Sequence, residues 1–195
     1  MKVAQALMQL GHDVRMFAPR EVRATGSSSL RDHYGVRLSP PLELLTSISG
    51  LKRLDFIVHA QRAAQKFGAE LIYTWLPQSA ALALWMKYPV VLEMHADVTG
   101  LMGAWWLRQF WNAKGKKTMT VTTSALRNVL ERSTKLKLEN EAVIVAPNGV
   151  ELERYASLPS PSEARRQLNL PDGLTVGFTG HIYPGRGAEL LFELA

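Results

Sequence analysis

Residues 70–94, ELIYTWLPQSAALALWMKYPVVLEM, carry the pattern that decides the fold. Both ends of this stretch are short apolar runs, ELIYT at 70–74 and PVVLEM at 89–94, which is typical of buried strands. Residues 78–87 between them have the length and apolar content of a helix. A strand, a helix and a second strand in succession predict two parallel strands joined by a helical crossover.

The same alternation continues in both directions along the chain. We therefore expect an α/β fold with a Rossmann-like, doubly wound parallel sheet. Either Thr123 or Ser124 is expected to cap one helix, and Ser160 to cap another. The expected strands are 12–18, 35–38, 70–74, 90–94, 118–122, 142–146 and 174–179, and the expected helices are 2–10, 47–67, 78–87, 101–116, 124–133, a short one from 161 and one from 187 to 195.

The composition is that of a globular protein with a sizeable core, since 47% of the 195 residues are hydrophobic and 21% are charged. Cysteine is absent, which excludes disulfides and thiolate metal sites and is compatible with a reducing cytosol. The five histidines lack the spacing of metal ligands, and no hydrolase or metalloprotease motif occurs. No stretch is apolar for long enough to span a membrane, and the first residues do not resemble a signal peptide.

The net charge of +6 is concentrated in one zone. Residues 1–98 carry +3, residues 99–140 carry +6 and residues 141–195 carry −3. The basic zone begins with Trp105, Trp106 and Trp111. The helix expected at 101–116 has a basic end formed by Lys114, Lys116 and Lys117. This helix is either docked on the sheet with its basic end in water, or in contact with an anionic membrane surface. Nucleic acid is disfavoured because no recognition motif is present.

Ligands of doubly wound sheets bind beyond the carboxyl ends of the strands, so the residues that follow each strand are the candidates. His95 follows PVVLEM directly. A histidine there either bonds to a sugar hydroxyl and handles protons, or simply bonds to nearby backbone. Asn148 and Gly149 follow AVIVA and form a turn signal that carries the chain out of the sheet.

A glycine-bracketed loop follows LTVGFT and precedes a helix, which is the arrangement of an anion site at a helix N-terminus. Arg186 adds a fork of donors suited to phosphate. The loop matches neither the Walker pattern nor GxGxxG, so an ordinary strand-to-helix turn with a solvated arginine is the alternative.

Five segments together resemble the retaining, nucleotide-sugar-dependent glycosyltransferases with the GT-B fold, known as family 4. LGHDVRMFAP is similar to the family's first helix end and second strand, and VIVAPNGVELERY to its signature vipNGVDlerF, with Glu151 in place of Asp. LTVGFTGHIYPGRGAELLFELA resembles the start of its second domain. PVVLEMHAD and TVTTSALRNVLER match its strand–His and strand–Ser–helix segments. The segments follow the family's order across almost the whole chain.

The resemblance implies a role for each matching position. His95 corresponds to the histidine near the reaction centre, which contacts the donor sugar. Arg186 corresponds to the basic residue that binds the donor diphosphate, and Gly180 to the position where backbone approaches it. His181 stands where many members have a second arginine, Gly185 belongs to the same donor loop, and Asn148 and Gly149 lie where the chain leaves the first domain. No metal or other cofactor is implied, because the nucleotide-sugar is a substrate.

The resemblance also implies an organisation into two domains. Residues 1–155 match the acceptor-side domain without its first strand and glycine-rich loop, 156–171 a linker, and 172–195 the first βα unit of the donor-binding domain. The family's second domain also carries a Glu-x7-Glu motif, and the 195 residues stop well before its position, so we expect an inactive fragment of a cytoplasmic enzyme, which also suits the inner face of a membrane. Its acceptor would be a carbohydrate or a lipid-linked molecule. The alternatives are a non-catalytic module that pairs with a separate chain, and a basic membrane-surface protein.

Overall fold

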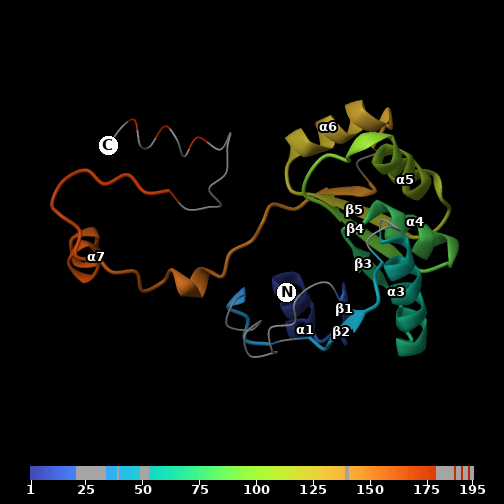
Figure 1. The fold of residues 1–195 in the computed structure, drawn as a ribbon, viewed down its shortest axis with the longest axis horizontal. Helices are drawn as coiled ribbons and strands as arrows, with labels where there is room; N and C mark the ends of the chain where they lie inside the picture. Colours follow the sequence, from blue (N-terminus) through green and yellow to red (C-terminus); the bar gives the residue numbers. More distant parts are fainter. Residues whose placement is uncertain are drawn as a thin grey trace. The chain divides into compact units, whose positions relative to one another are not determined.

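The computed structural model describes residues 1–20, 34–38, 40–48, 53–138 and 141–178, together with Gly187, Leu190 and Glu193. It divides into two compact units, Met1–Asn148 and Gly149–Ala195, each considered by itself below. The elements of the first unit are α1 (Lys2–Gln9), β1 (Met16–Pro19), β2 (Leu42–Leu45), α3 (Leu54–Phe67), β3 (Ile72–Thr74), α4 (Pro77–Trp85), β4 (Val90–Met94), α5 (Gly100–Asn112), β5 (Lys117–Val121), α6 (Ser124–Thr134) and β6 (Val143–Val145) (Figure 1).

The strands of the first unit form two parallel sheets. β1 pairs with β2, and the other sheet has the order β3-β4-β5-β6. Each pair in the larger sheet is joined through one helix, which is the connection that parallel strands require. The expected α/β class with parallel, Rossmann-like strand–helix alternation is therefore confirmed.

The core lies on one face of the larger sheet, under α4, α5 and α6 (Figure 1). Alternate residues of β4, which are Val90, Leu92 and Met94, are buried on this face, as the two-residue period of a strand requires. Leu107 and Phe110 of α5 are fully buried against them. The opposite face carries half-buried side chains such as Val91, Glu93 and Thr120.

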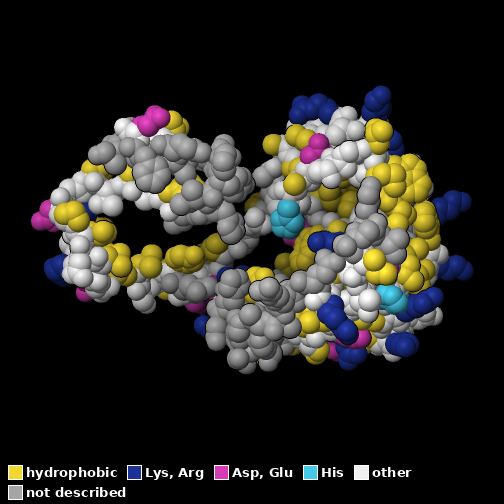
Figure 2. Space-filling model, viewed as in Figure 1, with side chains coloured by type: hydrophobic (Ala, Val, Ile, Leu, Met, Phe, Trp, Pro, Cys, Tyr) yellow, Lys and Arg dark blue, Asp and Glu magenta, His cyan; other side chains and the backbone are white. Residues whose placement is uncertain are grey.

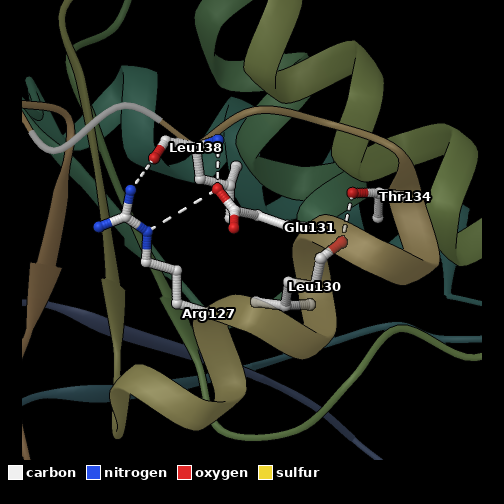
Figure 3. Close-up of polar contacts among 5 residues, drawn as sticks. All are labelled: Arg127, Leu130, Glu131, Thr134 and Leu138. Carbon is white, nitrogen blue, oxygen red and sulfur yellow. Dashed lines mark hydrogen bonds and ion pairs between the residues drawn. The ribbon is translucent and has the colours of Figure 1, made fainter.

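Polar contacts hold the end of α6 and the segment that follows it (Figure 3). Glu131 accepts a hydrogen bond from the Leu138 amide at 2.9 Å and lies 3.9 Å from the Arg127 guanidinium, which donates to the Leu138 carbonyl. The buried hydroxyl of Thr134 donates to the Leu130 carbonyl at 2.5 Å. The first two side chains thus satisfy the backbone groups of Leu138, which lies outside the helix, and the Leu130 carbonyl satisfies the buried hydroxyl of Thr134.

The short strand expected at 35–38 is wrong, and the strand lies at Leu42–Leu45 instead. The amides of Arg37 and Leu38 donate to the side-chain oxygen of the buried Gln5, so they are used by a side chain and not by a ladder. Leu42–Leu45 pairs in register with Met16–Pro19. The double proline at 40–41 thus precedes a strand where we had expected it to follow one.

Several boundaries also differ from the expected ones. The first strand begins at Met16, where the amide first bonds to the neighbouring strand through the Pro41 carbonyl. α3 begins at Leu54, because Arg53 adopts a left-handed conformation with φ of 66°; residues 49–52 of the helix expected at 47–67 lie outside the described residues. α5 ends at Asn112. Thr123 is the cap of α6, accepting a hydrogen bond from the Leu126 amide.

The second unit contains the short 3-10 helix η2 (Leu152–Arg154) and α7 (Pro161–Gln167), which Ser160 caps as expected. The strand expected at 174–179 is wrong for the described residues 174–178, which have no regular structure. Leu174 and Val176 are 97% and 68% exposed. A strand needs a partner for its backbone groups, and no described residue pairs with this segment. Most of the helix expected at 187–195 lies outside the described residues.

Candidate functional site

His95 lies immediately after the carboxyl end of β4, where ligands of parallel sheets bind. Its side chain is 46% exposed and lines a pocket of about 550 Å³. The polar side of this pocket includes Glu93, His95 and Asp97, and its apolar side includes Leu76, Met102 and Trp106. An apolar hollow with a few converging polar groups is the usual form of a small-molecule site.

Glu93 holds the polar side of the pocket together. One carboxylate oxygen, Oε1, lies 2.9 Å from Nε2 of His95. The other, Oε2, accepts hydrogen bonds from the Tyr73 hydroxyl at 2.5 Å and from the Trp75 indole N–H at 2.6 Å. The alternative in which the His95 ring only bonds to nearby main chain is therefore replaced by a contact with a carboxylate.

The surroundings of Tyr73 shift the pKa of its hydroxyl. Burial raises the pKa of Tyr73, and its hydrogen bond to Glu93 and the negative charge of Glu93 raise that pKa further, because all three disfavour a second negative charge. A smaller effect from Thr120, which faces Glu93 in the β4–β5 register, acts in the opposite direction. Tyr73 consequently stays a hydrogen-bond donor at physiological pH.

On the other side of the pocket, hydrogen bonds and the close approach of α5 fix the position of the loop that follows His95. Asp97 accepts hydrogen bonds from its neighbouring Val98 amide at 2.8 Å and from the Ser133 hydroxyl of α6 at 2.7 Å. Gly103 of α5 faces Val98 so closely that a Cβ on Gly103 would lie 3.2 Å from the Val98 Cβ. The close approach of α5 to this loop thus shapes the pocket wall.

Hydrophobic side chains gather over α4 and α5, with lysines and arginines at the edge of the patch (Figure 2). Trp85, Leu101, Met102 and Trp105 are exposed large hydrophobic residues of these helices. Trp106, which lines the pocket, lies 4.6 Å from Trp105 and 6.0 Å from Trp85 between ring centroids, so the pocket is continuous with this aromatic surface.

The basic end of this surface contains fewer exposed lysines than the sequence indicated. Lys114 and Lys116 are exposed, but Lys117 belongs to β5, where its amine donates to the carbonyls of Trp111 and Ala113. These bonds satisfy the last carbonyls of α5. Burial lowers the pKa of Lys117, which is the expected direction for a desolvated amine.

A family model described as Glycosyltransferase Family 4 matches residues 1–154 of the chain. The chain belongs to glycosyltransferase family 4. Membership supports a glycosyltransferase-type function on a sugar donor and an acceptor. Searches of the curated proteins and of the solved structures gave no match.

The structure describes only some of the site residues that the sequence of this family 4 chain predicts. The structure describes His95, which lies in the pocket, and Asn148 and Gly149, which are exposed at the boundary between the two units. The predicted donor-loop residues Gly180, His181, Gly185 and Arg186 lie outside the described residues, so their roles stay predictions. Within the described residues, no helix is long and apolar enough to cross a membrane.

Sequence reasoning missed Glu93, Tyr73 and Trp75. A signal for them was present: Glu93 is a charged residue inside the apolar run PVVLEM, two positions before His95. Tyr73 and Trp75 are likewise two positions apart. Because a strand has a period of two, this spacing could have placed each pair on one face, but the register of the neighbouring strands was needed to bring the pairs together.

Proposed function

We propose that this chain forms the acceptor side of an enzyme that transfers a sugar from a nucleotide-sugar donor to an acceptor, with retention of configuration. The single observation that carries the proposal is the position of His95, beside Glu93 in a pocket at the carboxyl end of β4. His95 is the group that contacts the reacting sugar, and the apolar wall of the pocket receives the acceptor. The nucleotide-sugar is a substrate, and we assign no metal or other cofactor.

The donor side of the proposal rests on residues 180–187. Gly180, His181, Gly185 and Arg186 form the loop that binds the donor diphosphate, with Arg186 as the charged contact. We also propose that the 195-residue chain alone does not turn over nucleotide-sugars, because catalysis needs the donor and acceptor groups positioned together.

The role of His95 is tested in a chimera in which the donor-domain residues of a family 4 enzyme complete the chain. We expect His95→Ala to lower release of the nucleoside diphosphate by on the order of a hundredfold, since a reacting group is lost. The matched control is His59→Ala, which changes an exposed histidine of α3. Equal activity of both variants would remove His95 from the reaction centre. Robust turnover by the uncompleted chain would instead overturn its proposed inactivity.

The donor loop is tested by calorimetric titration of the same chimera with a nucleoside diphosphate. Arg186→Ala should weaken binding about 10- to 150-fold, the loss of one charge-assisted hydrogen bond. Arg186→Lys should weaken binding less than Arg186→Ala, because lysine keeps the positive charge although it cannot form the paired hydrogen bonds of a guanidinium. Arg166→Ala, on the exposed side of α7, serves as the control. Unchanged affinity of Arg186→Ala would make Arg186 a solvated loop residue.

We further propose peripheral contact with an anionic membrane on its cytoplasmic face, and a lipid-linked acceptor. The supporting observation is the exposed aromatic surface of α4 and α5 beside Lys87, Lys114 and Lys116, which are exposed. Apolar side chains enter the headgroup region while lysines attract anionic lipids, each contributing about 1 kcal/mol.

Co-sedimentation of the chain with vesicles tests the membrane contact. Lys114→Glu with Lys116→Glu should reduce binding to vesicles that contain phosphatidylserine and leave binding to neutral vesicles unchanged. Arg62→Glu with Lys66→Glu, two exposed positions of α3, makes the same charge change elsewhere on the first unit. Equal loss in both double variants would mean that only net charge matters and that Lys114 and Lys116 form no specific contact with the membrane.

A further inference from the structure

Three hydrogen-bond donors converge on the carboxylate of Glu93, whose side chain is only 14% exposed. The donors are the hydroxyl of Tyr73, the indole N–H of Trp75 and Nε2 of His95. Two of them share Oε2, and His95 meets Oε1 at 2.9 Å. A carboxylate offers acceptors only, so each neighbouring group must present a proton to it.

The backbone explains why these four side chains meet. Glu93 and His95 are two residues apart along and just beyond β4, and Tyr73 and Trp75 are two residues apart along and just beyond β3. β3 pairs with β4 in the parallel register Tyr73↔Val91, which brings the two strand ends side by side. The four side chains therefore form a two-by-two arrangement on one face of the sheet.

We propose that Glu93 is a positioning residue for His95. Its Oε1 fixes the proton of the neutral imidazole on Nε2, so that Nδ1 carries the lone pair and is the ring atom left for a ligand in the pocket. Tyr73 and Trp75 hold Oε2 and thereby fix the orientation of the carboxylate. The consequence for transfer rests on the proposed function, whereas the contact itself does not.

The isosteric change Glu93→Gln tests this arrangement, because an amide has one acceptor oxygen where the carboxylate has two. That oxygen should stay with the two donors, Tyr73 and Trp75, and the amide NH₂ then faces His95. His95 can accept this hydrogen bond only through an unprotonated Nε2. We therefore expect the variant to move the imidazole proton from Nε2 to Nδ1.

The tautomer is read from the ring ¹⁵N shifts of the 195-residue chain at a pH of about 8.5, well above the ordinary range of histidine titration. The signals are assigned with His95→Gln. The parent should show the Nε2–H form with a ring proton protected from exchange, and Glu93→Gln should show the Nδ1–H form. Glu70→Gln, the same change at an exposed position before β3, should leave the His95 signals unchanged.

Three results would overturn the proposal: an unprotected Nε2 proton in the parent chain, which needs no variant; an unchanged tautomer in a folded Glu93→Gln; and the same tautomer change in Glu70→Gln. A second variant, Tyr73→Phe, leaves Oε1 free to bind His95, so its His95 should keep the Nε2–H form. A shift to Nδ1–H in Tyr73→Phe would also contradict the assignment.

Activity in the completed chimera separates this inference from the proposed function. If both hold, Glu93→Gln lowers kcat by roughly tenfold to a hundredfold, as misplacement of a reacting group does, while the KM for the donor changes little. A tautomer change in Glu93→Gln together with full activity of His95→Ala would refute the proposed role of His95 and leave the positioning by Glu93 established.

Discussion

Residues 117–121, KTMTV, and residues 174–178, LTVGF, both combine β-branched with apolar residues, but only the first forms a strand. β5 pairs with β4 on one side and β6 on the other, and its Met119 and Val121 are buried under the helices. The second segment has no described neighbour to pair with, and its Leu174 is 97% exposed. β-Propensity thus measures the fit to a half-buried sheet more than a preference of the backbone itself.

The comparison extends to the two units that contain these segments. All five tryptophans lie in the first unit, so tryptophan fluorescence reports on that unit alone. Matched substitutions in the two units can therefore be compared in one urea-unfolding experiment. A given substitution should lower the free energy of unfolding where a core surrounds it, and it should leave the fluorescence transition unchanged where it lies in the second unit.

The largest difference is expected for phenylalanine. Phe110→Ala removes a fully buried ring beneath β4 and should lower the free energy of unfolding by about 3–5 kcal/mol, the usual range for a core cavity. Phe178→Ala, at a 42% exposed position in the second unit, should change it by less than about 0.5 kcal/mol. A comparable loss in both variants would mean that residues 174–178 pack as a strand in solution.

Two glycines with similar backbone conformations provide the next comparison. Gly115 has φ of 135°, and a Cβ there would lie 3.1 Å from Leu84 Cδ2. Gly173 has φ of 130° with open space around it. Gly115→Ala should cost about 1–3 kcal/mol through backbone strain and that contact. Gly173→Ala should leave the fluorescence transition in place, and a shift there would show coupling between the units.

The helix caps give a smaller effect. Thr123 caps α6 in the first unit, and Ser160 caps α7 in the second. Thr123→Ala should lower the unfolding free energy of the first unit by about 1 kcal/mol. Ser160→Ala should reduce only the helical circular dichroism of α7. If Ser160→Ala moved the fluorescence midpoint as far as Thr123→Ala does, the two units would not unfold independently.

The smallest effect concerns the pH dependence of the first unit. The pKa of Tyr73 is raised in the folded state, so its contribution to stability is complete below about pH 10 and is lost as the pH rises further. Tyr73→Phe should therefore weaken the alkaline decline in unfolding free energy, whereas Tyr155→Phe, in the second unit, should not. An alkaline ultraviolet titration should show one fewer late-ionising tyrosine in Tyr73→Phe, and equal curves for the two variants would contradict the assignment.

Much of the fold could be predicted from residues 70–145, because local periodicity and burial agree there. β4 was expected at its observed position, and the neighbouring strands within one or two residues. The strand at 35–38 was misplaced because nothing local reveals that the buried Gln5 binds the amides of Arg37 and Leu38. That contact joins residues more than 30 positions apart.

The candidate site divides in the same way. His95 could be found from the sequence, because a residue that follows a parallel strand has a known place at the edge of the sheet. Its partners could not be found, since Tyr73 and Trp75 reach Glu93 only through the β3–β4 register. Lys117 was assigned to a basic surface, and its actual position against the last carbonyls of α5 depends on how that helix ends.

The sequence by itself determined the α/β class, the order of most elements and the membership of glycosyltransferase family 4, because these follow from short-range patterns and from segments compared one at a time. The tertiary structure alone decided which apolar segments become strands and which polar side chains converge on Glu93. The physical reason is that a strand and a hydrogen-bonded carboxylate both depend on partners distant in the chain, and only the folded structure brings those partners within bonding distance.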